Sequence, residues 1–271
     1  MSDATAGTTD DVLLEADGVN VRFGGLLALS EVCLHTRQGR ITGLVGPNGA
    51  GKTTLFGVLT GYVRPLGGRV LFRGQEITRK APQERARLGI SRTFQHPQLF
   101  ASLSVAEHLS LGYRMGNSPG RILRDLAGIN GWRRPKRAER EAVDTLIEVL
   151  GLQAVAHRGC ASLPTGIARL VEVGRALAAE PTMLLLDEPA AGLDERESDE
   201  LFRALQLASA DKGVSLLVVE HDLDFVMGLC EFVYVLDAGA LIASGTPGEV
   251  QSNPAVQEAY LGAEHVSGGT R

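Results

Sequence analysis

Val45-Gly46-Pro47-Asn48-Gly49-Ala50-Gly51-Lys52-Thr53-Thr54 is the stretch that decides the fold, because from Gly46 to Thr53 it matches the phosphate-loop pattern G-x-x-x-x-G-K-[ST] at every position. The apolar run 41–45 before it predicts a buried strand, and 54–59 after it continues at helical spacing. Glycines let the backbone aim N–H groups at phosphate oxygens, the helix start is electropositive, Lys52 adds a full charge, and Thr53 offers a hydroxyl to Mg²⁺. The stretch therefore predicts a nucleotide site. A glycine-rich turn that binds nothing is the alternative that its context disfavours.

The composition of the 271 residues fits a globular chain with a sizeable core, since 44% of them are hydrophobic. No uninterrupted apolar run approaches the roughly 18 residues of a membrane span, and 1–10 is small and polar. We therefore expect a chain that stays in the cytoplasm and reaches a membrane only through a protein partner. The net charge of −5 argues against a general affinity for nucleic acid or anionic lipid.

Neither the cysteines nor the basic residues predict a further site. Cys33, Cys160 and Cys230 are odd in number and lack metal-ligand spacing, so we expect reduced and mostly buried thiols. The irregular stretch 113–137 ends in the cluster Arg133-Arg134-Pro135-Lys136-Arg137. Such a cluster is typical of a solvated loop, with contact to lipid headgroups or a partner as the alternative.

The pattern along the chain predicts strands that alternate with helices, and hence a largely parallel sheet. Alternation on both sides of Gly24-Gly25 indicates two antiparallel strands, and 61–78 is typical of a hairpin that completes a small β layer. Helical spacing dominates 103–150, where Ser104 is a candidate N-cap. The same criteria predict further helices at 81–88, 162–179, 198–210, 222–229 and 254–261, and a hairpin over 232–243.

Two apolar strands end in groups suited to catalysis. Residues 183–186 are followed by Asp187 and Glu188, and 215–219 lead to His221. Because sites of α/β proteins form at the carboxyl ends of parallel strands, we expect these three side chains to take part in the chemistry of the predicted nucleotide site.

Two other residues are ambiguous on spacing alone. Gln95 ends a short strand over 89–95, where an amide side chain is equally typical of a solvated strand end. Phe23 ends the first strand and is a candidate either for the core or for stacking on adenine.

Together, the phosphate loop, Gln95, the helix start at 163–166, Asp187-Glu188 and His221 resemble the nucleotide-binding subunits of ABC transporters, and the match spans nearly the whole chain. The resemblance implies an α/β fold, in which a P-loop NTPase core with a parallel sheet carries an antiparallel β subdomain and an inserted helical subdomain. It implies ATP as the nucleotide and Mg²⁺ as the metal, and it weakens the alternative of a P-loop kinase. We expect the ATPase domain over 11–262, the helical subdomain at about 96–165, and tails at 1–10 and 263–271.

The resemblance also implies a role for each residue. Asp187 would hold Mg²⁺ through water, Glu188 would polarise the attacking water and His221 would contact the γ-phosphate, while Lys52 neutralises charge as phosphoryl transfer requires. Gln95 is similar to the Q-loop residue that links the metal with the transmembrane partner, Asp194 to the D-loop aspartate at the dimer seam, and Phe23 to the A-loop aromatic. The implied nucleotide contacts are Phe23, Gly46, Pro47, Asn48, Gly49, Ala50, Gly51, Lys52, Thr53, Thr54, Thr165, Gly166 and Asp194, and the implied metal contacts are Thr53, Gln95 and Asp187.

Four stretches narrow the resemblance to branched-chain amino acid importers, namely Phe23-Gly24-Gly25-Leu26, Gly89-Ile90-Ser91-Arg92-Thr93-Phe94-Gln95, Val219-Glu220-His221-Asp222 and the segment from Asn253-Pro254 to Ala259-Tyr260-Leu261-Gly262. Urea and short-amide importers share this pattern, and the ATPase of lipopolysaccharide export shares it in part. The implied partners are transmembrane permease subunits at the cytoplasmic face of the membrane, a second ATPase subunit and, indirectly, an external solute-binding protein. An ATP-binding dimerisation switch with weak hydrolysis is the alternative of a different class.

The chain departs from the family at the signature, which usually reads Leu-Ser-Gly-Gly-Gln and is here Leu163-Pro164-Thr165-Gly166-Ile167. The serine hydroxyl and the glutamine amide are both missing, so Thr165 is the candidate for a substitute hydroxyl and the Gly166 N–H is expected to remain available. Since importers of this kind often pair two different ATPases, we expect a heterodimer with unequal sites.

Overall fold

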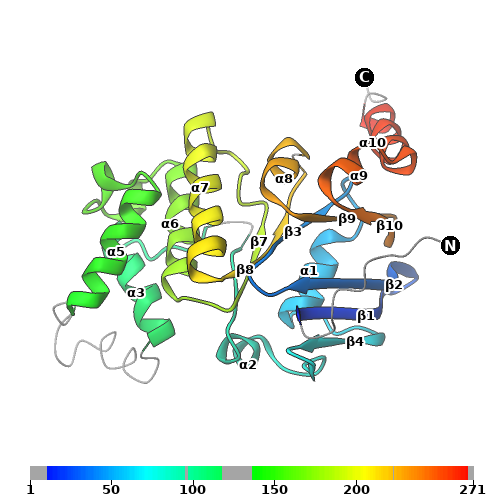
Figure 1. Ribbon diagram of the computed structural model, residues 1–271, viewed down its shortest axis with the longest axis horizontal. Coiled ribbons are helices and arrows are strands. Elements are labelled where there is room, and N and C mark those ends of the chain that lie inside the picture. The colour runs from blue at the N-terminus through cyan, green and yellow to red at the C-terminus, as the bar shows by residue number, and fades with distance from the viewer. Residues whose placement is uncertain (1–10, 95–96, 118–135, 222, 268–271) are drawn as a thin grey trace. The chain divides into compact units, whose positions relative to one another are not determined.

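The computed structural model describes residues 11–94, 97–117, 136–221 and 223–267 (Figure 1). The chain divides into two compact units, of which the first combines Met1–Leu88 with Ser215–Arg271 and the second is Gly89–Val214. Over 165–237 strands alternate with helices, as the sequence pattern predicts.

An antiparallel sheet in the order β2-β1-β4-β5 forms one layer of the first unit. It consists of β1 (Val12–Phe23), β2 (Leu26–Arg37), β4 (Gly67–Phe72) and the short β5 (Gln75–Glu76). The expected turn and hairpin are confirmed, because Phe23 pairs with Leu26 across the turn and β4 pairs antiparallel with both β1 and β5.

The parallel strands of the first unit centre on β3 (Ile41–Val45), in which every residue is buried. On one side β3 pairs in parallel with β8 (Ser215–Val219), and on the other with β9 (Phe232–Asp237). The strand β10 (Ala240–Gly245) is antiparallel to β9. Burial on both faces explains why β3 and β8 are continuous apolar runs rather than alternating ones.

The helix that follows the phosphate loop, α1 (Lys52–Thr60), is buried along most of its length. Its last carbonyls are satisfied by Arg85 of α2 (Pro82–Arg87), whose Nη1 donates to the carbonyls of Val58 (2.7 Å) and Leu59 (2.6 Å). Burial lowers the pKa of Arg85 to about 10, and a cation at a helix carboxyl end offsets the helix dipole. A side chain 26 and 27 residues downstream of these carbonyls thus fixes the helix that follows the loop.

Three helices complete the first unit after β8, namely α8 (Leu223–Leu229), α9 (Pro247–Gln251) and α10 (Pro254–Ser267). The sequence analysis did not predict α9, although Thr246 and Glu249 form a capping box around Pro247 at its first position. The last helix runs beyond Leu261, where its pattern was expected to end.

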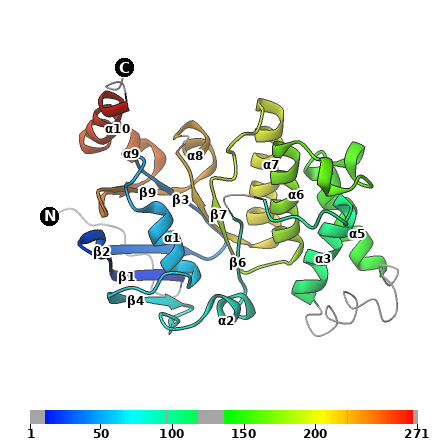
Figure 2. The same cartoon turned by 180° about the vertical axis from the view of Figure 1, so that it is seen from behind.

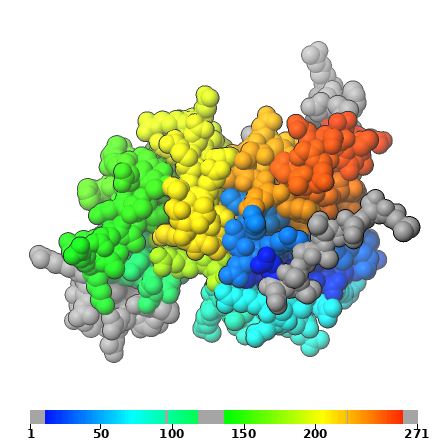
Figure 3. Space-filling view, in the orientation of Figure 1, coloured from blue at the N-terminus to red at the C-terminus, as the bar shows by residue number. Residues whose placement is uncertain are grey.

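In its described residues the second unit contains two parallel strands and four longer helices (Figure 2). Strand β6 (Ile90–Arg92) pairs with β7 (Met183–Asp187), whose five residues are all buried. The helices are α3 (Val105–Asn117), α5 (Arg137–Val149), α6 (Thr165–Ala178) and α7 (Glu195–Lys212), with 3-10 turns η3 (Gln153–Val155) and η4 (Cys160–Ser162) between α5 and α6. One side of α7 is buried, and the other is visible in Figure 3.

Polar side chains cap one helix of the second unit and join it to another. Ser104 caps α3 as predicted, because its Oγ accepts from the N–H of Glu107 and the Glu107 carboxylate accepts from the N–H of Ser104. A buried ion pair between Arg114 and Glu139, 2.7 Å apart, joins α3 to α5.

The cysteine expectation is corrected at one position. Cys160 and Cys230 are buried free thiols, and burial raises the pKa of Cys230 to about 12. Cys33 is exposed, because it faces outward on β2, where its sulfur accepts a hydrogen bond from the N–H of Gly18.

Candidate functional site

The phosphate loop leaves β3 through backbone that only glycine can adopt. Gly46 has φ +152°, and a Cβ there would lie 2.0 Å from the carbonyl oxygen of Leu236. Gly51 has φ +104° and begins α1 as its N-cap. Because a side chain at either position would collide with neighbouring chain, these two glycines are required by packing as well as by phosphate binding.

Lys52 is held against the loop that it follows. Its Nζ donates to the carbonyl oxygens of Gly46 (2.5 Å) and Pro47 (3.0 Å), and only 7% of the residue is exposed. Burying an ammonium group requires such partners. The charge therefore lies at the start of α1, where an anion would also meet the positive end of the helix.

The C-terminal helix α10 approaches the same loop. Burial raises the pKa of Tyr260 to about 12. The backbone N–H of Gly46 faces the Tyr260 hydroxyl and lowers this pKa by a smaller amount. This contact was not predicted, because 214 positions of sequence separate a loop glycine from a tyrosine on a terminal helix.

His221 belongs to the same unit and follows β8. Its backbone N–H donates to the Glu220 carboxylate at 3.2 Å, and its Nδ1 lies 3.6 Å from the same oxygen. The imidazole is exposed, whereas the Glu220 side chain is fully buried. The imidazole is therefore open to the solvent beside a buried carboxylate.

Asp187 and Glu188 stand at the carboxyl end of β7, as predicted. Asp187 is buried, and its backbone N–H donates to the hydroxyl of Thr93 at 3.2 Å. Glu188 has φ +47°, a left-handed conformation that is uncommon for a residue with a side chain and that recurs at functional sites.

The signature and the turn before α7 meet within the second unit. Asp194 is the N-cap of α7, where its carboxylate accepts from the N–H of Glu197 at 2.8 Å. The Glu197 carboxylate also lies against Gly166, so that a Cβ there would be 2.1 Å from it. Gly166 is therefore buried rather than open as expected, whereas Thr165 is exposed at the start of α6.

The remaining predicted residues divide between the units. Phe23 is 54% exposed at the end of β1, so it is not a core residue. Gln95 and Asp222 lie outside the described residues, as does most of the stretch 113–137. The first unit holds Phe23, the phosphate loop and His221, and the second holds Thr165, Gly166, Asp187, Glu188 and Asp194.

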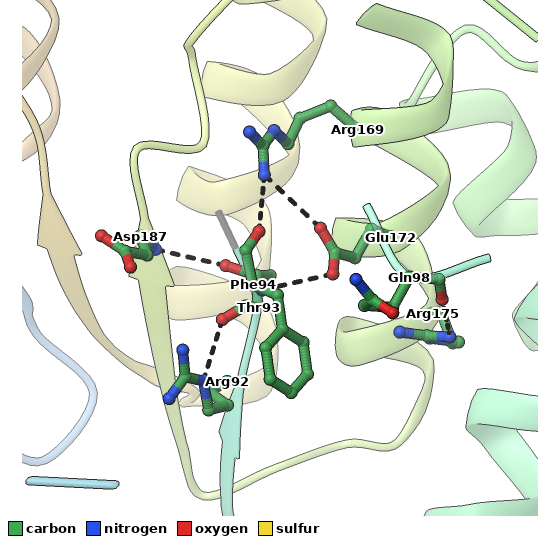
Figure 4. Close-up of polar contacts among 8 residues, drawn as sticks. All are labelled: Arg92, Thr93, Phe94, Gln98, Arg169, Glu172, Arg175 and Asp187. Atoms are coloured by element: carbon green, nitrogen blue, oxygen red, sulfur yellow. Dashed lines mark hydrogen bonds and ion pairs between the residues drawn. The ribbon is translucent and has the colours of Figure 1, made fainter. Parts of the chain in front are cut away.

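A set of polar residues next to Asp187 was missed by the sequence analysis (Figure 4). Arg169, Glu172 and Arg175 of α6 contact the backbone of Phe94 and Gln98, which flank Gln95. Their spacing of three residues in an otherwise apolar helix was the available signal.

Each unit by itself offers an oxygen group of the hard type that Mg²⁺ takes. The Thr53 hydroxyl is exposed in the first turn of α1, and the Asp187 carboxylate ends β7. Mg²⁺ takes hard oxygen ligands, keeps several waters and is usually bound by one or two protein groups together with substrate phosphates. Within the described residues no group of three or more His, Cys, Asp or Glu side chains is placed to hold a metal by itself.

Comparison with known proteins finds two families that match parts of this chain. The family described as ABC transporter matches residues 29–191, and the one described as branched-chain amino acid ATP-binding cassette transporter matches residues 240–266. Among the described residues, no helix combines the length and apolar character that a membrane crossing needs.

Individual relatives cover nearly all of the chain. The high-affinity branched-chain amino acid transport ATP-binding protein LivG of Salmonella typhimurium is 39% identical over 253 residues, which are 92% of this chain and 98% of the relative. The corresponding protein BraF of Pseudomonas aeruginosa is 37% identical over 92% of this chain and 98% of its own length.

A solved structure agrees with the sequence relatives. The ADP conformation of an ATP-binding cassette of an ABC transporter superposes with a TM-score of 0.78 at 34% identity, covering 93% of this chain and 99% of that one. The phosphate loop, the strand-end carboxylates and these likenesses lead to one conclusion. The chain belongs to the ABC transporter family, whose ATP-binding subunits are ATPases.

Proposed function

We propose that this ATPase powers an importer of branched-chain amino acids. The likeness to LivG and BraF over 92% of the chain is the observation that carries the proposal. The match of residues 240–266 to a branched-chain amino acid transporter family supports it, because this match is separate from the general ABC match at 29–191. Urea, short amides and lipopolysaccharide stay as alternative cargoes.

The reaction follows from the residues. Lys52 would contact the phosphates of ATP, Asp187 would hold Mg²⁺ through water, and His221 would contact the γ-phosphate. Glu188 would accept a hydrogen bond from the attacking water and orient it, which is a general-base role. Mg²⁺, when bound, would supply charge neutralisation at the phosphates. Phe23 stacks on adenine, since an exposed ring at the end of β1 has no core to fill.

The partners are transmembrane permease subunits, a second ATPase subunit and an external solute-binding protein. The membrane contact is made through the permease at the cytoplasmic face, since the net charge of −5 gives the chain no attraction to anionic lipid. The altered signature favours a heterodimer, in which the stronger site uses Lys52 and Glu188 of this chain.

The test is reconstitution of the chain with its permease and solute-binding protein in lipid vesicles. We expect ATP hydrolysis that branched-chain amino acids stimulate and that urea, short amides and lipopolysaccharide do not. Stimulation by another cargo would replace the proposed substrate, and ATP binding without turnover would favour the dimerisation switch. Bare vesicles are the control, and the purified chain should not bind them.

A further inference from the structure

Three charged residues lie in one row of α6, at positions 169, 172 and 175, and we call Arg169, Glu172 and Arg175 the α6 anchor. The side chains of Arg169 and Glu172 are only 5% and 1% exposed. Charged groups are costly to bury, so they are retained where they have specific polar partners. Most of the partners of the α6 anchor are backbone groups of one segment.

The α6 anchor holds Phe94 by both of its backbone groups (Figure 4). Nη1 of Arg169 donates to the carbonyl oxygen at 2.7 Å, and the N–H donates to Oε1 of Glu172 at 3.2 Å. The two side chains are farther from each other, at 3.5 Å between Nη1 and Oε2. The contacts to Phe94 are therefore closer than the ion pair that accompanies them.

The same row of side chains holds Gln98. Nη1 of Arg175 donates to the carbonyl oxygen of Gln98 at 2.7 Å. The backbone N–H groups of Gln98 and Phe94 both hydrogen-bond to the Glu172 carboxylate. Both contacts lower the pKa of Glu172, although burial raises it more. Side chains of α6 thus bind the backbone at both Phe94 and Gln98.

The held segment is also tied to the strand that ends in Asp187. The N–H of Thr93 donates to the carbonyl oxygen of Leu185 at 3.0 Å, and the Thr93 hydroxyl accepts from the N–H of Asp187 at 3.2 Å. The ring of Phe94 additionally lies under the guanidinium of Arg92, 4.6 Å from its centroid. A continuous set of contacts leads from α6 through Phe94 and Thr93 to Asp187.

Stability alone does not account for such a row. Replacing a buried ion pair by apolar residues of similar volume is often neutral or stabilising, so a pair that serves only the core has no advantage over leucine or methionine. Hydrogen bonds to both backbone groups of one residue do have an advantage, because they fix a backbone position that apolar contacts would leave free to slide.

We propose that Arg169 and Glu172 are positioning residues that hold the backbone of Phe94, so that the signature helix α6 fixes, through Phe94 and Thr93, the position of Asp187. The proposal rests on the role of Asp187 given under the proposed function. It predicts that a change at Glu172 alters turnover without altering the affinity for ATP.

The experiment compares Glu172→Ala with Glu139→Ala in the full chain. Glu139 is the matched control, because it also belongs to a buried Arg–Glu pair of the second unit but contacts Arg114 rather than Phe94. Three quantities are measured for each variant: the melting temperature, kcat with the Kd for ATP, and amide hydrogen exchange of the peptide over 90–98.

We expect Glu172→Ala to speed exchange at Phe94 by about 10- to 100-fold, the equivalent of one hydrogen bond to a charged group. We also expect kcat to fall by on the order of 10-fold or more with the Kd unchanged, since misplaced groups lose rate rather than binding. Glu139→Ala should leave the exchange at 90–98 unchanged and should keep more of kcat at an equal loss of melting temperature.

Equal losses of kcat in the two variants at equal melting temperature would overturn the proposal, and so would unchanged exchange at Phe94 in Glu172→Ala. Glu172→Gln covers the case in which alanine prevents folding. It keeps an acceptor for the Phe94 N–H and loses the charge, so exchange at Phe94 should be faster than in the wild type but by less than the increase expected for Glu172→Ala. A wild-type chain without ATPase activity would refute the proposed function, whereas the exchange comparison would still test the contact.

Discussion

The backbone N–H of Asp187 donates to the hydroxyl of Thr93 across 3.2 Å, which joins the end of β7 to the residue that follows β6. Thr93 is fully buried, so no water replaces this acceptor. The position of a proposed metal contact therefore depends on a hydroxyl that carries out no chemistry itself.

Replacing the Thr93 hydroxyl should lower both the stability and the activity. Thr93→Val keeps the shape but leaves a buried N–H without its acceptor, which costs about 1–3 kcal/mol. We expect a lower free energy of unfolding in urea and a lower kcat, and we expect Thr93→Ser to restore both in large part. A valine variant as stable and active as the wild type would show that the bond is dispensable.

Glu188→Gln should separate binding from turnover. The amide cannot accept the proton of the attacking water, so we expect kcat to fall by on the order of 10²-fold or more while the Kd for ATP stays nearly constant. Glu180→Gln is the matched control, because Glu180 also has a positive φ, +50°, and precedes β7. Near wild-type activity of Glu188→Gln would remove Glu188 from the catalytic role.

Lys52→Ala should weaken ATP binding as well as hydrolysis. The substitution removes a charged hydrogen-bond donor to the phosphates, worth about 1.5–3 kcal/mol, so titration calorimetry should show an affinity lower by roughly 10- to 100-fold. Lys136→Ala, at an exposed position before α5, serves as the control. An unchanged affinity in Lys52→Ala would contradict the assignment of the loop.

His108 should make the stability of the second unit sensitive to acid. Burial lowers its pKa below 6.5, its Nε2 accepts from the N–H of Phe100 at 2.8 Å, and its Nδ1 donates to the carbonyl oxygen of Ser104. The groups that face it are Glu107, which raises the pKa, Arg175, which lowers it, and the Cys160 sulfur at 3.3 Å.

The sign follows from linkage. The folded state keeps His108 neutral, so its contribution to stability is complete above pH 6.5 and is lost as the pH falls from there toward the folded pKa. We expect the urea midpoint of the wild type to fall more than that of His108→Gln between about pH 7.5 and pH 5.5. His157→Gln, at an exposed position, should behave like the wild type. If the difference in urea midpoint between the wild type and His108→Gln did not change with pH, the linkage would be contradicted.

The signature should make the two sites of a heterodimer unequal. Ile167 replaces the family's glutamine, and Gly166 is covered by Glu197, so the site that faces this signature lacks the glutamine amide and depends on the exposed Thr165 for a hydroxyl. The assembled transporter is assayed with Glu188→Gln in this chain and then with the matching change in its partner. We expect the first change to remove more hydrolysis, and equal losses would refute the asymmetry.

The sequence alone determined the features that depend on neighbouring residues. The phosphate loop, the apolar strands β3, β7 and β8, the Ser104 cap and the order of the elements follow from local patterns, because a turn, a cap or a strand period is set within a few positions. The same locality places Asp187 and Glu188 at a strand end. The fold class was predicted correctly for this reason.

Only the tertiary structure decided which distant residues meet. Four contacts join positions between 26 and 214 residues apart, and no period of the sequence encodes them. They are Arg85 with the last turn of α1, Tyr260 with Gly46, Glu197 with Gly166, and α6 with Phe94. Cys33 was misjudged for a related reason, since the face of a strand that turns outward is chosen by the layer packed against it. Pairings of this kind are fixed by the packing of whole elements, which has to bury the apolar faces and satisfy the polar groups at the same time.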